Sequence, residues 1–148
     1  MLRINTLIIF GLFIFLSCEK EGNEKKISDY NKTDSHNTGQ NCMNCHQSGG
    51  SGEGWFTVAG SVYNEALTSV APNTTVKLYT GANGTGNLVA TIKVDGIGNF
   101  YTTEKIDFGS GLYPAVQGAT VTKYMGSSVS DGACYKCHNS TVGKIWTK

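Results

Sequence analysis

The sequence predicts a mainly β fold, a small antiparallel β-sandwich with short loop or helix segments at both ends. Between residues 55 and 125, short runs rich in Val, Tyr, Thr and Ile alternate apolar and polar residues, as half-buried strands do. Glycine- and asparagine-rich turns separate these runs, and none of the runs has the period of an amphipathic helix. Residues 55–125 are therefore expected to form the sandwich.

Six runs are expected as strands, in chain order residues 55–63, 75–79, 88–94, 99–102, 112–116 and 119–124. Val76 and Leu78 show the alternation well, because polar residues flank each of them. Turn residues occupy 81–87, 95–98 and 109–111. Pro114 lies inside the fifth run and predicts an edge position there, since proline cannot donate to a strand ladder.

One copy of the same five-residue motif, C-x-x-C-H, lies on each side of the β region. The two copies are Cys42-Met43-Asn44-Cys45-His46 and Cys134-Tyr135-Lys136-Cys137-His138. At this spacing two thiols can add to the vinyl groups of one haem while the adjoining imidazole reaches its iron. The motifs predict two covalently bound haem c groups, with the four cysteines as attachment points and His46 and His138 as proximal iron ligands.

Two other uses of paired cysteines are open. A four-thiolate zinc site needs two C-x-x-C pairs, but zinc ribbons space them by about 15–20 residues. Here Cys45 and Cys134 lie much further apart in the chain. Disulfides suit an exported protein. Neither alternative accounts for a histidine after each second cysteine, so haem is favoured.

The sixth ligand of each iron decides whether a haem passes electrons or binds a small molecule. His36, just before the first motif, is the histidine outside the motifs and is the expected distal ligand of either haem, if the two stack. Met125, before the second motif, is a further candidate and would raise the potential of its haem. Met43 is expected to point away from the iron.

A sandwich that brings both motifs to one end would pack the haems against each other and against Trp55 or Trp146. Trp55 is better explained as a packing residue of the first strand.

The amino terminus has the pattern of an export signal. In residues 1–17, Arg3 precedes an apolar run that is too short to span a bilayer as a helix. The following Cys18 resembles the lipidation site of bacterial lipoproteins, although Phe15 replaces the commoner leucine. The resemblance implies cleavage before Cys18 and its lipidation; the alternative is an ordinary signal peptide. It also implies the cell envelope of a Gram-negative bacterium, with the anchor in the outer membrane on its periplasmic or surface face.

Residues 18–39 are interpreted as a disordered tether, because charged residues alternate with Asn, Ser, Thr and Gly. Ile27 and Tyr30 are the residues of this segment that could contact a core. The haem segments are then residues 40–54 and 126–148.

Two family resemblances follow from these motifs. The C-x-x-C-H pairs resemble those of multihaem c-type cytochromes, here a dihaem lipoprotein. Gly60-Ser61-Val62, Val76-Lys77-Leu78 and the run from Asp95 through Gly98 to Phe100 resemble the G-x-V, V-x-L and D-x-x-G-x-F patterns of the carboxypeptidase-regulatory-like, or transthyretin-like, domain. The second resemblance covers residues 56–125. It implies a seven-strand-like sandwich that acts as a spacer, folding partner or binding module and carries no catalytic residues.

The charge balance argues against nucleic acid as a partner. The formal net charge is +1, which falls to zero when Arg3 leaves with the signal. Four haem propionates would then bring it to about −4. We therefore expect an electron carrier and not an enzyme, exchanging single electrons with redox proteins such as other cytochromes or a quinol-linked complex. The alternatives are a small haem enzyme or sensor with one open axial site, peroxidase-like or gas-binding, and a surface adhesion module.

Overall fold

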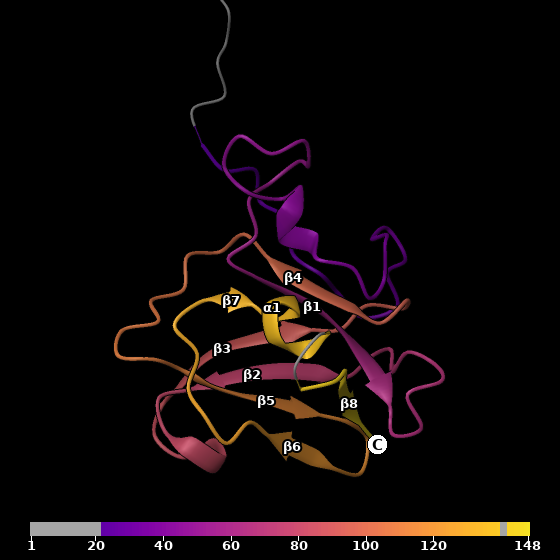
Figure 1. The fold of residues 1–148 in the computed structure, drawn as a ribbon, viewed down its shortest axis with the longest axis vertical. Helices are drawn as coiled ribbons and strands as arrows, with labels where there is room; N and C mark the ends of the chain where they lie inside the picture. The colour runs from indigo at the N-terminus through magenta and orange to yellow at the C-terminus, as the bar shows by residue number, and fades with distance from the viewer. Residues whose placement is uncertain (1–21, 140–141) are drawn as a thin grey trace, which may run out of the picture.

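The computed structural model describes residues 22–139 and 142–148, which form two four-stranded β-sheets packed face to face (Figure 1). The expected mainly β class and sandwich architecture are confirmed. The expected signal peptide, residues 1–17, and Cys18 lie outside the described residues. In the part of the chain that is described, no helix has the length and apolar character to cross a bilayer.

The first sheet is built around β1 (Val58–Asn64). β1 pairs antiparallel with β4 (Asn99–Thr102) and parallel with both β7 (Gly132–Ala133) and β8 (Ile145–Thr147). The sheet is therefore mixed, whereas the sequence predicted antiparallel pairing throughout. The reason is that β7 and β8 come from the expected second haem segment, which returns along β1 in the same direction.

The second sheet has the order β3-β2-β5-β6, and all its pairs are antiparallel. Its strands are β2 (Thr75–Tyr79), β3 (Leu88–Lys93), β5 (Tyr113–Gln117) and β6 (Thr122–Tyr124). A short 3-10 turn, η2 (Ala82–Gly84), lies between β2 and β3. The remaining short turns, η1 (Cys42–Asn44) and α1 (Tyr135–His138), each form part of one cysteine motif.

The hydrophobic core lies between the sheets. Val58 and Val62 of β1 and Phe100 of β4 meet Val76 and Leu78 of β2, and all five side chains are at most 4% exposed. The alternation seen in the second expected strand is thus that of a strand with one buried face.

The prediction of an edge position for Pro114 is wrong, because β5 lies between β2 and β6. Met125 N donates to Pro114 O at 2.9 Å, so the missing N–H of Pro114 would also have faced Met125. Met125 lies just beyond the end of β6. The proline therefore removes only a terminal bond of the ladder, which a central strand can tolerate.

The interpretation of residues 18–39 as a disordered tether is wrong for residues 22–39. This segment, here called the strap, runs along the edge of β4 and then over the turn between β3 and β4. Ser28 is 2% exposed; its N–H donates to Tyr101 O at 3.0 Å, and its hydroxyl donates to Lys93 O at 2.6 Å. Ile27 bridges Thr102 but stays 40% exposed. The strap is held by polar bonds to backbone and side-chain groups of the sandwich, which hydrophobic content does not reveal.

Candidate haem-binding sites

The two C-x-x-C-H motifs fold into the same backbone turn. In the first, the N–H groups of Cys45 and His46 both donate to Cys42 O, at 3.2 and 3.0 Å. In the second, those of Cys137 and His138 donate to Cys134 O, at 3.3 and 3.0 Å. One helical turn places residues four apart on the same face. Each motif therefore presents its first cysteine and its histidine on one side.

Both histidines have the same ring nitrogen engaged by a backbone carbonyl. His46 Nδ1 lies 2.9 Å from Glu53 O, and His138 Nδ1 lies 3.0 Å from Gly143 O. A carbonyl oxygen only accepts, so in each ring Nδ1 carries the proton and donates. Nε2 then keeps its lone pair, which is the state in which a neutral imidazole binds a metal.

Aromatic stacking and a close glycine fix the ring of His46. Phe56 stacks on it with ring centroids 4.1 Å apart and planes 8° apart, and Tyr101 of β4 stacks on the other side of Phe56. Gly52 approaches so closely that a Cβ there would lie 2.7 Å from His46 Nδ1. The glycine-rich loop after the first motif therefore wraps the imidazole, and it can do so because residue 52 has no side chain.

The strap brings His36 to the first motif. The ring centroids of His36 and His46 are 5.8 Å apart, with planes inclined by 35°. Two imidazoles on opposite sides of one metal ion have centroids about 6 Å apart when each metal–nitrogen bond is about 2 Å. The observed separation matches that span, so His36 and His46 could share one iron.

The second motif opens onto a cavity of about 470 Å³ between the sheets. Apolar core residues form its floor, among them Val58, Val76 and Phe100. Met125 and Trp146 line it together with the second motif. Its volume lies within the usual range of small-molecule and cofactor sites, about 300–1,000 Å³. An apolar macrocycle fits such a lining.

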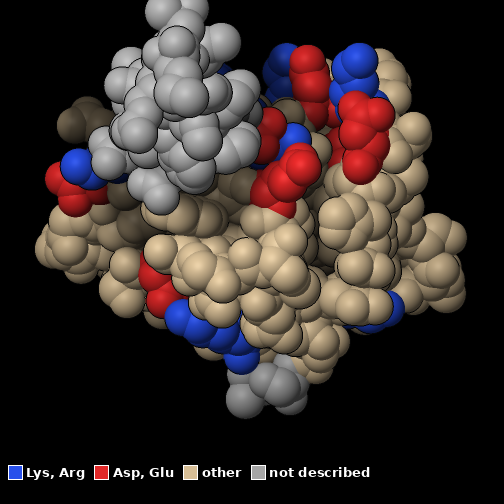
Figure 2. Space-filling model, turned by 90° about the horizontal axis from the view of Figure 1, so that it is seen from above, with Lys and Arg blue, Asp and Glu red and all other residues tan. Residues whose placement is uncertain are grey.

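Charged side chains at this cavity are mostly basic. Lys123, Lys136 and Lys144 contribute to its lining; Lys123 Nζ lies 3.9 Å from the centroid of Trp146, and Lys136 pairs with Asp131 at 2.9 Å. Lysines beside an apolar cavity suit a group with a flat apolar body and carboxylates at one edge, as haem has. Elsewhere, on the face that Figure 2 shows, basic and acidic side chains lie next to each other.

The thiol of Cys134 is packed against β1. Its Cβ lies 3.3 Å from the position that a Cβ on Gly60 would take. Burial raises the pKa of Cys134 to about 12, and the nearby Cys42 and Cys137 thiols add to the rise. Burial also raises the pKa of Cys42.

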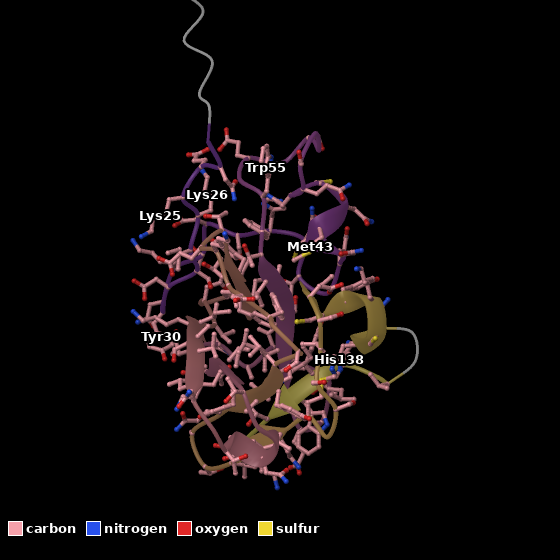
Figure 3. The ribbon with its side chains drawn as sticks, turned by 90° about the vertical axis from the view of Figure 1, so that its left-hand side faces the viewer. Lys25, Lys26, Tyr30, Met43, Trp55 and His138 are labelled. Atoms are coloured by element: carbon pink, nitrogen blue, oxygen red, sulfur yellow. The ribbon has the colours of Figure 1, made fainter. Side chains whose placement is uncertain are left out.

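The two motifs lie on the same side of the sandwich. η1 lies directly above α1 in Figure 1, and Figure 3 shows the labelled Met43 and His138 on one side of the ribbon. Both turns flank β1, which lies beneath them.

The four motif cysteines are present as thiols in this structure. Among residues 22–139 and 142–148, no three His, Cys, Asp or Glu side chains gather where a metal ion could be held, and no disulfide joins the four motif cysteines. A four-thiolate zinc site would need all four thiols at one point.

The two tryptophans differ in their environment. Trp55 precedes β1, is 45% exposed and bonds through its backbone to the side chain of Asn23, so its assignment as a packing residue of the first strand is wrong. Trp146 lies in β8 and lines the cavity. Sequence reasoning missed Phe56 and Gly52 as partners of His46. Their nearness to the motif and the run of glycines between them were the available signals.

Comparisons of the chain with protein-family models, with curated proteins and with solved structures found no match.

Proposed function

We propose that this protein is an exported, lipid-anchored dihaem c-type cytochrome that carries single electrons at the cell envelope. One observation carries the proposal: two separate C-x-x-C-H motifs adopt the same turn, and in each the histidine keeps Nε2 as the basic nitrogen. A structural cysteine pair gives no reason for that repeated histidine geometry.

In this proposal Cys42 and Cys45 hold one haem through thioether bonds and His46 binds its iron. Cys134, Cys137 and His138 do the same for the second haem. When bound, each haem iron takes up or gives up one electron at a time. The chain's own residues orient the ligands. The carbonyls of Glu53 and Gly143 fix the histidine tautomers, and a proton shared with a carbonyl increases the basicity of Nε2.

The two sites would differ in the second residue that could bind each iron. His36 is the proposed distal ligand at the first, supported by its 5.8 Å ring separation from His46. Met125 is the candidate at the second, supported by its place in the cavity that contains His138. A His–Met haem has a higher potential than a bis-His haem.

A second candidate function rests on the same cavity. If Met125 packs against the cavity wall without binding iron, the second haem has an open position beside about 470 Å³ of apolar space. Such a site would bind a small neutral ligand such as carbon monoxide or nitric oxide. The protein would then be a gas sensor or a small peroxidase-like enzyme.

The location and partners remain those that the sequence predicts. Cys18 is the proposed lipid attachment point, in the outer membrane of a Gram-negative bacterium, on its periplasmic or surface face. Four chain steps from Cys18 to residue 22 can span at most about 14 Å, so the strap end of the domain would lie close to the lipid. Other redox proteins, and no nucleic acid, are the proposed partners.

The test is production in a bacterium that matures c-type cytochromes, followed by intact-protein mass measurement. Two covalent haems are expected in the native chain. One haem is expected in Cys42→Ala/Cys45→Ala and one in Cys134→Ala/Cys137→Ala. A colourless, unmodified chain would refute the proposal. Carbon monoxide added to the reduced native protein separates the two functions: slow binding that must first displace a distal ligand supports the electron carrier, whereas rapid binding to one haem supports the open site.

A further inference from the structure

Two buried polar side chains lie beneath the strap at the point where it approaches the first motif. Asp95 and Asn99 are 1% and 2% exposed, at the turn between β3 and β4. Asp95 Oδ1 accepts from the backbone N–H groups of Ile97 and Asn99, at 3.0 and 2.9 Å. These bonds close the turn and account for the buried carboxylate of Asp95. The side chain of Asn99 takes no part in them.

The amide of Asn99 is directed at the residues around His36. Its Nδ2 lies within hydrogen-bond distance of three strap oxygens, namely Ser35 Oγ at 2.9 Å, Thr38 Oγ1 at 3.1 Å and His36 O at 3.2 Å. On its other side, Oδ1 accepts from Ser61 Oγ at 2.6 Å. Since Ser61 Oγ itself accepts from Gly39 N, its proton is available to Asn99. This bond sets the orientation of the amide.

The strap is therefore fixed on both sides of His36. Before it, Ser35 Oγ donates to Asp95 Oδ2 at 2.5 Å. After it, Gly39 N donates to Ser61 Oγ at 2.9 Å, and Thr38 Oγ1 donates to Ile97 O at 3.2 Å. The side chain of His36 is exposed and is not part of the core. Its backbone is instead held by groups buried in the sandwich.

We infer that Asn99 is a positioning residue for His36, holding the strap so that this imidazole stays beside His46. The inference rests on the proposed haem function. It adds to that proposal the group that holds the distal ligand His36 in place. An exposed histidine on a mobile segment loses conformational entropy whenever it binds a metal, and this loss weakens the bond. A buried amide that already orders the backbone removes most of that loss, which is preorganisation of the ligand.

Asn99→Asp tests this role with little change of shape. The aspartate keeps an oxygen for Ser61 but has no N–H groups for the three strap oxygens. In the reduced holoprotein we expect carbon monoxide to bind the first haem at least about tenfold faster than in the native protein. His36→Ala provides the upper limit. The low-spin EPR signal of the first haem should shift in the same two variants.

Ser28→Ala is the matched control, because it removes a buried polar bond between the strap and the sheet, away from His36. It should lower the unfolding midpoint and leave carbon monoxide binding and the EPR signal unchanged. Should Asn99→Asp be too unstable to purify, Thr38→Val removes one of the three acceptors at nearly constant volume and should act in the same direction.

The outcomes separate the inference from the proposed function. If His36→Ala alters the first haem and Asn99→Asp or Thr38→Val behaves like Ser28→Ala, Asn99 is a structural residue only and the inference is refuted. If His36→Ala leaves the spectra unchanged, His36 is no ligand, and both the inference and the proposed distal ligation fail. If the native chain carries no haem, the proposed function fails first.

Discussion

Replacement of Ser28 by alanine tests whether the strap is part of the fold. The Ser28 hydroxyl, in a residue only 2% exposed, donates to Lys93 O at 2.6 Å and accepts from Tyr101 N at 3.0 Å. Alanine would leave the Tyr101 N–H group without this acceptor and remove one donor from the Lys93 carbonyl. A buried group left unsatisfied costs about 1–3 kcal/mol. We therefore expect Ser28→Ala to lower the free energy of unfolding by about 2–3 kcal/mol.

Guanidinium denaturation of the holoprotein, followed by far-ultraviolet circular dichroism, measures this change directly. For a domain of this size the loss corresponds to a fall in melting temperature of about 8–12 °C. The control is Ser127→Ala, at an exposed position, where a change within about 0.5 kcal/mol is expected. Equal stability of the two variants would mean that residues 22–39 are a tether after all.

Limited trypsin digestion gives an independent measurement. Lys26 has its N–H bonded to Thr103 Oγ1 at 2.9 Å, and its carbonyl accepts from Thr103 N at 2.9 Å. A protease must free these backbone groups before it can cleave, so cleavage after Lys26 should be slow in the native protein and faster in Ser28→Ala. Rapid cleavage there in the native protein would contradict the strap.

Four further predictions concern the two sites. Gly52→Ala should alter the visible spectrum of the first haem alone, because its Cβ would lie 2.7 Å from His46 Nδ1; Gly126→Ala, whose Cβ meets nothing within 4 Å, should not. Met125→Leu keeps the side-chain volume without the sulfur, so potentiometry should show a lower potential for the second haem, and an unchanged titration would exclude Met125 as a ligand. Before haem attachment, Cys134 should be the slowest motif thiol to react with iodoacetamide at pH 8. The reason is that its pKa of about 12 leaves only about one Cys134 thiol in ten thousand ionised at this pH. Since that thiol ionises near pH 9 when unfolded, the apoprotein should lose stability as the pH rises from 9 to 12; a flat stability profile in this range would contradict the burial.

The sequence predicted most accurately the strands that are specified by a local pattern of residues. The expected runs at 75–79 and 99–102 coincide with β2 and β4, because alternation and flanking turn residues specify both. β7 and β8 were missed. Gly132–Ala133 has no strand preference of its own, and both elements form because β1 offers them a parallel partner. Such pairing between distant segments leaves no local pattern to detect.

The prediction that the strap is disordered was wrong for a related reason. Its charged and polar composition is that of a disordered segment. The structure holds it through Ser28, Ser35 and Thr38, which bond to groups at a sheet edge and a turn. Single hydroxyls of this kind have no sequence signature. By contrast, the short helical turn in each cysteine motif depends on residues close together in the chain, whereas the surroundings of each turn depend on the tertiary fold.

The place of β1 in the topology explains how such a small domain can support two sites. The first motif lies before β1 in the chain. The second lies between β7 and β8, which both run parallel to β1. Each turn is thereby fixed relative to the same strand, and Gly60, in the middle of that strand, leaves room for Cys134. Sites supported by strands are held more precisely than sites supported by loops alone. In the proposed function β1 would help to hold the two haems at a defined separation, because β7 and β8, on either side of the second motif, both pair with it.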